Sequence, residues 1–236
     1  VDISSLTIHY TVESLGNPWL LSALHPEIKT QLGKTVEVLS SSSSCNIQSF
    51  DGFPEMHSLL NAFQMWSALM SREKTEPFSV TIREGLQPFK SLPNIMIEFM
   101  KSVFEQSPHT LPALLLSIAE YAVDLTPGEN ARMCDMAMNI KKKLVEKLRG
   151  NNVLIMPSLP TPAPLHNESL IRIFDTSNTS FFNVMELPAT AVPLGLSTDG
   201  LPLGIQVISG PGQDHLCIAV AVALQKAGIA HWSAPI

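Results

Sequence analysis

Apolar residues recur every three or four positions along several stretches of the chain, and this spacing predicts amphipathic helices. The stretch LPNIMIEFMKSVF at residues 92–104 shows it best, because its apolar side chains fill a broad stripe of one helix that has Pro93 in its first turn. The next stretch, residues 111–123, leaves only a narrow polar stripe. Further helices are predicted near residues 25–39, 56–70, 126–149 and 214–227.

Strands are indicated by alternating or wholly apolar runs between these helices. Residues 6–12 alternate and are rich in β-branched side chains, and residues 153–156 (VLIM) are wholly apolar. A wholly apolar run is typical of a strand whose sheet is covered on both faces. Asp199-Gly200 predicts a hairpin between residues 189–196 and 201–208. Strands interleaved with long helices predict an α/β fold.

Local signals predict where some of these elements start and end. Thr126 and Glu129 form a T-x-x-E capping box at the start of a helix, and Gly150 is expected to end it. Asp214 is expected to cap the last helix. The five serines at residues 40–44 are expected to form a solvated loop, since a nucleophilic serine needs a base and a shaped turn.

The composition is that of a chain with a sizeable apolar core and little charge. Of its 236 residues 45% are hydrophobic, enough for one large domain or two small ones. The formal net charge of -6 argues against a nucleic-acid partner. No apolar run reaches the roughly 18–20 residues that span a bilayer. The start Val1-Asp2-Ile3, without an initiator Met, is typical of a segment of a longer protein.

No residue pattern predicts a catalytic centre, a metal site or a cofactor site in this chain. The sequence holds no G-x-S-x-G, phosphate-loop, dinucleotide-binding or H-E-x-x-H motif. The seven histidines show no i, i+4 pair, and the three cysteines have no ligand or disulfide spacing. Asp214 and His215 match the order of a serine triad, but adjacent residues at a helix start point in different directions. The capping role of Asp214 is therefore preferred.

Residues 157–164 (PSLPTPAP) follow directly on a predicted buried strand. Ligands in α/β sheets bind at the carboxyl ends of strands, so a ligand-binding loop is one interpretation. A rigid connector is the other, because proline fixes the backbone without any ligand. The sequence alone leaves both interpretations open.

Several motifs in the second half of the chain resemble a known family. They are NVLIMP at 152–157, Pro160-Thr161-Pro162-Ala163-Pro164, Asn183 with Pro188-Ala189, Pro193-Leu194-Gly195, and GLPLGIQ at 200–206. In this order they are similar to the C-terminal half of the amidase signature family. FQMWSALMS at 63–71 with Glu76-Pro77, and Asp214-His215-Leu216, resemble its fatty-acid amide hydrolase 2 branch.

The resemblance covers most of the chain, most strongly after Asn151 and most weakly over residues 34–58. It implies that residues 1–236 form the C-terminal portion of the amidase signature fold, a mixed β-sheet covered by helices. Members of the family use a Ser–cis-Ser–Lys triad and a glycine-rich oxyanion loop in a G-G-S-S-G context. This chain has no such motif. No catalytic residue is carried over, and the triad is expected upstream.

On the substrate side the resemblance does assign residues of this chain. In fatty-acid amide hydrolases the segment before the motif asparagine lines the acyl channel, which corresponds here to Ile173, Thr176, Ser180 and Phe181. The competing interpretation is that these side chains only pack against the sheet. Glu186 stands where many members have glycine, so a positive φ at this position would strain it.

Residues 92–124 fall where such hydrolases carry a membrane-facing helix pair, and a nearly all-apolar pair suits shallow insertion at an interface. Burial in the core is the alternative interpretation. The resemblance implies an intracellular, membrane-associated protein with a lipid amide substrate, peripheral membrane contact and a homodimer. It implies no cofactor and no metal.

The expected function is the C-terminal part of a serine amide hydrolase that cleaves fatty-acid amides through an acyl-enzyme. One alternative is a non-catalytic truncated fragment that binds lipid or a partner. Another is a soluble amidase or amidotransferase subunit of the same family. This chain alone is expected to be inactive because the nucleophile is expected upstream.

Overall fold

The computed structural model of the chain divides into two units. It describes residues 1–14, 21–43, 45–53, 61–72, 92–111, 113–115, 117–118, 127–166, 168–170 and 172–232. The larger unit combines Val1–Phe63 with Ala137–Ile236, and the smaller unit is Gln64–Met136. Helix α7 (Pro127–Lys147) contributes residues to both units.

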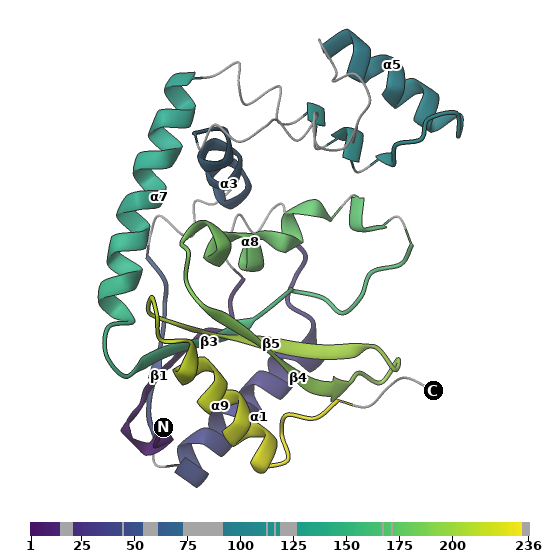
Figure 1. Cartoon of the computed structure of the whole chain (residues 1–236). Coiled ribbons are helices and arrows are strands. Elements are labelled where there is room, and N and C mark those ends of the chain that lie inside the picture. The colour runs from purple at the N-terminus through teal and green to yellow at the C-terminus, as the bar shows by residue number, and fades with distance from the viewer. Residues whose placement is uncertain are drawn as a thin grey trace. The chain divides into compact units, whose positions relative to one another are not determined.

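A five-stranded mixed sheet forms the centre of the larger unit (Figure 1). In spatial order its strands are β2 (Asn46–Ser49), β1 (Thr7–Tyr10), β3 (Asn152–Pro157), β5 (Pro202–Ser209) and β4 (Ala189–Leu196). β1 is parallel to both β2 and β3, whereas β5 is antiparallel to both β3 and β4. The predicted α/β fold with a mixed sheet is confirmed.

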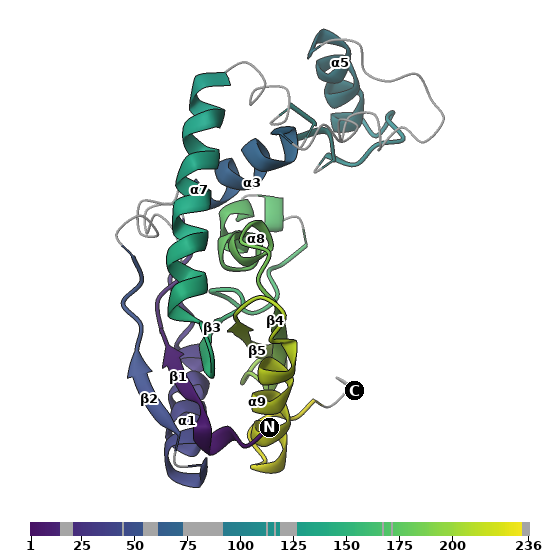
Figure 2. The ribbon, with the colours of Figure 1, turned by 60° about the vertical axis from the view of Figure 1, so that its left-hand side comes forward.

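Helices α1 (Pro26–Ser43) and α9 (Asp214–Lys226) lie together on one face of this sheet (Figures 1 and 2). The core on this face joins alternate strand residues such as Ile8, Ile155 and Val207 to helix residues such as Leu32 and Val220, all of them buried. Each such side chain contributes about 1.5–3 kcal/mol when it leaves water. This face therefore provides much of the stability of the larger unit.

The other face of the sheet is also covered, but it includes two buried polar side chains. His9 lies opposite Leu154 in the register, and Gln206 lies opposite Met156. All four are buried, as the wholly apolar run at 153–156 predicted. A buried polar group is costly without hydrogen bonds, so the side chains of His9 and Gln206 both need hydrogen-bond partners.

The predicted strands, hairpin and helices are confirmed wherever the structure describes them. Gly200 has a φ of 77°, as the turn between β4 and β5 requires. The apolar stripe of α7, continued by Leu148 directly after the helix, is buried except for the half-buried Met136. Its buried members are Met133, Ala137, Ile140, Leu144 and Leu148. Gly150 follows the helix with a φ of 71°, whereas Thr126 of the predicted capping box lies outside the described residues.

The prediction of a serine loop is wrong, because α1 continues through Ser43. Serine can remain in a helix when its hydroxyl donates to a carbonyl one turn earlier. Ser41 does this, since its Oγ donates to the carbonyl oxygen of Glu37 at 2.9 Å. Ser44 lies outside the described residues.

The predicted cap of the last helix is also displaced. Asp214 is the first residue of α9, and Gln213 occupies the cap position without a side-chain capping bond. Asp214 still suits the first turn, because its negative charge lies near the positive end of the helix dipole. In the helix predicted at 56–70, α3 is described from Asn61 to Arg72, and residues 54–60 lie outside the described part.

The smaller unit contains α5 (Leu92–Val103), which matches the strongest helix prediction. Ile95 of α5 and Leu114 of the following helical residues are buried together, with Phe99 and Ile118 packed against them. Much of the predicted apolar stripe nevertheless faces solvent: Met96, Ile97, Met100, Val103 and Phe104 are all exposed. In the described part of the chain, no helix is both long and apolar enough to cross a bilayer.

Candidate functional site

The predicted substrate-binding residues lie on one short helical segment that follows β3. After η2 (Glu168–Leu170), η3 (Ile173–Thr176) runs directly into α8 (Ser177–Val184). Thr176 is exposed and Ser180 is half-buried, and the Ser180 hydroxyl donates to the Thr176 carbonyl oxygen at 3.0 Å. Ile173 begins η3, but its side chain lies outside the described part of the structure.

Phe181 differs from Thr176 and Ser180 because the chain itself buries it. Its side chain has 0% of its surface exposed, and that of Phe182 has 1%. The two rings meet edge to face, with centroids 5.3 Å apart and planes at 88°. This is a favourable aromatic geometry. The two rings therefore fix α8 to the interior, while Thr176 and Ser180 lie nearer the surface.

A buried amide network joins α8 to the sheet. The Gln206 side-chain amide of β5 donates to the carbonyl oxygens of Pro157 at 3.3 Å and Asn178 at 3.1 Å. The Asn178 side-chain amide donates to the same Pro157 oxygen at 3.1 Å. Gln206, the last residue of the G-L-P-x-G-I-Q motif, thus holds the start of α8 against the end of β3.

The proline-rich loop is held at two of its carbonyl groups. Its first residue, Pro157, is the acceptor of this amide network. Further along, the Pro160 carbonyl oxygen accepts a hydrogen bond from the backbone N–H of His25 at 2.8 Å. These bonds fit the rigid-connector interpretation, in which the loop positions the α8 segment over the sheet.

Asp175 is a buried carboxylate next to the predicted substrate residues. Its Oδ1 accepts a hydrogen bond from the backbone N–H of Ser22 at 2.8 Å, and the side chain is 7% exposed. Its Oδ2 has no hydrogen-bond partner among the residues that the structure describes. Glu168, the other nearby acid, forms an ion pair with Arg172 at 2.6 Å. The two carboxylates are therefore engaged separately.

The other groups that could act as nucleophiles or ligands show ordinary structural roles. Burial raises the pKa of the Cys217 thiol, which disfavours the reactive thiolate. All three cysteines are buried and none forms a disulfide. Within the described ranges, no group of three or more His, Cys, Asp or Glu side chains could hold a metal ion.

Glu186 adopts the left-handed backbone that the sequence analysis named as a source of strain, with a φ of 53°. This conformation costs a residue other than glycine roughly 1–2 kcal/mol. The Glu186 carboxylate pairs with the ammonium of Lys141 on α7. Its side chain is largely exposed, so this ion pair offsets only part of the backbone strain.

Comparison with known proteins assigns this arrangement to a family. A family model described as Amidase matches residues 15–218, which is most of the chain. The chain belongs to the amidase family. The motifs between residues 152 and 206, including Gln206, all fall within the matched part of this amidase sequence.

Two curated relatives are fatty-acid amide hydrolases. The amidase chain is 30% identical to human fatty-acid amide hydrolase 2 over 92% of its own length and 40% of that protein. It is 28% identical to zebrafish (Danio rerio) fatty-acid amide hydrolase 2-B over 96% of its length and 42% of that protein. The chain therefore spans less than half the length of these relatives.

A solved structure agrees in fold. A bacterial aryl acylamidase of the amidase signature family matches with a TM-score of 0.62 and 18% identity, over 96% of this chain and 44% of that one. The match supports the mixed sheet and its helical layers.

No sequence pattern assigned a role to Asn178 or Asp175, although both are buried beside the predicted residues. Neither belongs to a motif, and their partners at positions 157 and 22 are distant in the sequence. Gln206 offered a usable signal, because a lone amide between Ile205 and Val207 in a buried strand must find partners there.

Proposed function

We propose that the longer protein containing this chain hydrolyses fatty-acid amides, and that this chain forms one wall of the acyl-binding channel. Membership of the amidase family, with fatty-acid amide hydrolase relatives along nearly the whole chain, carries the proposal. In this proposal the nucleophile, its relay serine and its lysine lie upstream of this chain, whose own sequence holds no G-G-S-S-G motif. Cleavage transfers the acyl group to the serine, releases the amine, and water then frees the fatty acid.

In this proposal Thr176 and Ser180 form the part of the wall that touches the acyl chain. They lie four residues apart on a continuous helical segment and are not fully buried. Residues at this spacing lie on the same side of a helix. Phe181 supports the segment from the interior, and Ile173 belongs to the same segment.

The test measures hydrolysis of fatty-acid amides of different chain lengths by the longer protein. Thr176→Trp and Ser180→Trp are expected to reduce the ratio of kcat/KM for long over short acyl chains by about tenfold or more, because added bulk shortens the channel. Thr30→Trp is a matched control: Thr30 is exposed on α1, with its hydroxyl bonded one turn back to Pro26 at 2.9 Å.

Two outcomes would count against these ideas separately. If the longer protein hydrolyses no fatty-acid amide, the proposed activity is wrong. An unchanged chain-length profile in both tryptophan variants would leave the activity standing and remove the channel role. As a further arm, a fluorophosphonate probe is expected to label the longer protein and not the 236-residue chain alone.

We further propose that α5 contacts a membrane surface. Met96, Ile97, Met100 and Val103 of α5, with Phe104 directly after the helix, expose between 44% and 66% of their surface. Met96, Ile97, Met100 and Phe104 line one open hollow together with Lys101 and Gln106, and a mainly apolar surface of this kind suits shallow insertion between lipid headgroups. Such a surface would place the helix next to the lipid that carries the amide substrate.

Binding of the full chain to neutral phosphatidylcholine vesicles tests this membrane contact. Each large apolar side chain contributes about 1.5–3 kcal/mol when buried, so Ile97→Glu with Phe104→Glu is expected to lower the partition coefficient by more than about tenfold. The control is Ile218→Glu with Val222→Glu, which alters two exposed apolar residues of α9. Equal losses in both double variants would mean that α5 has no special role.

A further inference from the structure

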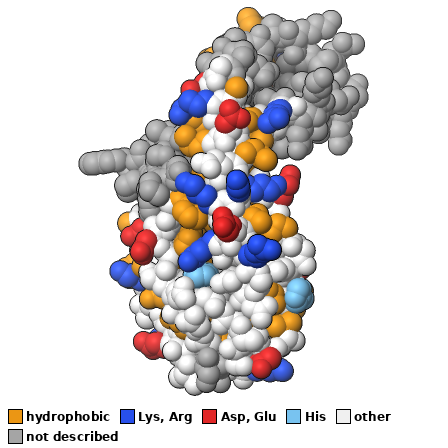
Figure 3. Space-filling view, turned by 90° about the vertical axis from the view of Figure 1, so that its left-hand side faces the viewer, with side chains coloured by type: hydrophobic (Ala, Val, Ile, Leu, Met, Phe, Trp, Pro, Cys, Tyr) orange, Lys and Arg blue, Asp and Glu red, His pale blue; other side chains and the backbone are white. Residues whose placement is uncertain are grey.

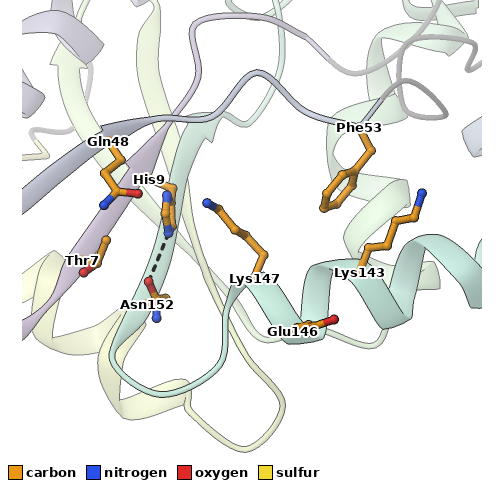
Figure 4. Close-up of a pocket in the computed structure, with 8 residues that line it drawn as sticks. All are labelled: Thr7, His9, Gln48, Phe53, Lys143, Glu146, Lys147 and Asn152. Carbon is orange, nitrogen blue, oxygen red and sulfur yellow. Dashed lines mark hydrogen bonds between the residues drawn. The ribbon is translucent and has the colours of Figure 1, made fainter.

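A second polar site lies on the larger unit, apart from the α8 segment. It is an open pocket of about 470 Å³ between strands β1, β2 and β3 and the last two turns of α7 (Figure 4). His9 and Asn152 line it from the sheet, while Lys143 and Lys147 line it from α7. Asn152 is the first residue of the NVLIMP motif, whereas His9, Lys143 and Lys147 belong to no family motif, and none of the four belongs to the acyl wall.

The hydrogen bonds around His9 settle which of its ring nitrogens carries the proton. The Asn152 side-chain amide donates to the carbonyl oxygen of Arg149 at 2.6 Å, so its Oδ1 faces the other way as an acceptor. His9 Nε2 lies 3.1 Å from this Oδ1 and is therefore the N–H donor. Nδ1 is left as a buried acceptor without a partner in the described part of the chain, in a residue only 2% exposed.

The charge around His9 is positive. Lys143 and Lys147 lie one turn apart on α7, and the Lys147 ammonium reaches toward the His9 ring in Figure 4. No carboxylate of the described residues forms an ion pair with Lys147. Glu146 is the acidic residue of the lining, and its carboxylate points away from His9 (Figure 4). Thr7 and Gln48 on the strands are uncharged hydrogen-bonding groups.

The wider surface favours the same sign of charge. Figure 3 shows several Lys and Arg side chains on the face that α7 presents, with acidic side chains interspersed among them; over residues 127–149 the basic residues outnumber the acidic ones. The chain as a whole carries a net charge of -6, so this basic face departs from the average of the molecule. Basic side chains at a helix C-terminus interact favourably with its dipole, which accounts for part of the cluster. The dipole does not explain why His9 Nδ1 is buried without a hydrogen-bond partner among the described residues.

We propose that this pocket binds a small oxyanion, the size of a phosphate or a short carboxylate, between the Lys147 ammonium and His9. Lys147 supplies the main charge-assisted hydrogen bond, and Lys143 adds positive potential from the next turn. Gln48 and Thr7 add neutral donors, and the Phe53 ring, whose centroid is 5.6 Å from the Lys143 ammonium, is the apolar part of the lining. The negative charge of the bound anion also stabilises the doubly protonated, positively charged ring of His9.

The protonation of His9 links anion binding to pH. Burial lowers the pKa of His9 from its usual 6.5, and the nearby Lys147 charge lowers it further, although the Asn152 bond opposes this. The unfolded chain therefore binds a proton below pH 6.5 that folded His9 does not, and stability falls as the pH drops through this range. An anion beside Lys147 raises the proton affinity of His9, so anion binding should strengthen as the pH falls.

The test titrates the full chain with inorganic sulfate, phosphate and acetate by calorimetry, and follows the His9 ring by NMR. Sulfate affinity is expected to rise from about pH 7.5 to about pH 5.5, the range in which histidine titrates. Sulfate is the pH probe because its charge stays constant there. Lys147→Gln is expected to weaken binding by about tenfold, the loss of one charge-assisted hydrogen bond.

Lys142→Gln is the matched control, because it removes the same charge from an exposed position on the same helix, outside the pocket lining. Equal weakening by Lys142→Gln and Lys147→Gln would overturn the proposal in favour of general charge attraction. The absence of saturable binding for all three anions would overturn it as well. Saturable binding that leaves the NMR chemical shifts of the His9 ring unchanged would also overturn the proposal. A preference for sulfate and phosphate over acetate, or the reverse, would identify the source of the oxyanion.

Discussion

Replacing Phe181 with alanine is expected to lower the free energy of unfolding by about 3–5 kcal/mol, the usual cost of removing a buried aromatic ring. The ring is fully buried and meets Phe182 edge to face. Its removal deletes apolar burial and leaves a cavity beside the Phe182 ring. Urea denaturation of the full chain, followed by fluorescence and circular dichroism, measures the change.

Thr176→Ala is the control for this experiment, because it truncates an exposed side chain in the same segment and should change stability by at most about 0.5 kcal/mol. A Phe181→Ala variant with unchanged stability would show that the ring is not part of the packed interior. The proposed contact of Phe181 with the acyl chain would then be the interpretation left to test. The experiment thus separates the packing and channel interpretations that the sequence left open.

Gln206→Leu is expected to cost about 1–3 kcal/mol, the usual penalty for leaving buried polar groups without their partner. Leucine approximately keeps the volume of the side chain but removes the donors to Pro157 and Asn178. Pro157 keeps its bond from the Asn178 amide, so the loss falls mainly on the α8 side of the network. Chemical denaturation gives the size of the effect.

The same substitution at Gln48 is the control, since Gln48 is exposed on β2. A double variant of Gln206 and Asn178 should lose more than the sum of the single losses, because only the double change leaves the Pro157 carbonyl oxygen without either side-chain donor. Strict additivity would mean that the two amides act independently. In the longer protein, Gln206→Leu should also alter the acyl-chain profile, because it releases the start of α8 from β3.

Local sequence signals predicted the elements of this fold but not the contacts between distant segments. Asp199-Gly200 specified the hairpin because few residues tolerate its turn, and the VLIM run specified a buried strand because no polar group interrupts it. The serine run misled because propensity is a weak guide where tertiary packing of the preceding turns extends a helix.

The sites required spatial information that no local pattern contains. Residue 9 approaches residues 147 and 152 only because β1 pairs with β3 in one particular register. The amide network likewise joins residues 157, 178 and 206. Family resemblance identified the α8 segment as the place of the predicted substrate residues. Which of its side chains are exposed and which are buried depends on the side of the helix that packs inward.

The rates at which the three buried thiols are modified can measure how often their surroundings open. Cys134 belongs to the smaller unit, whereas Cys45 and Cys217 belong to the larger one. A thiol reagent in solution modifies a buried cysteine when its surroundings open, so modification rates resolved by peptide mass spectrometry give a local opening free energy for each unit. A cysteine introduced on the surface would react long before these three, which permits selective attachment of a probe without first removing the native thiols.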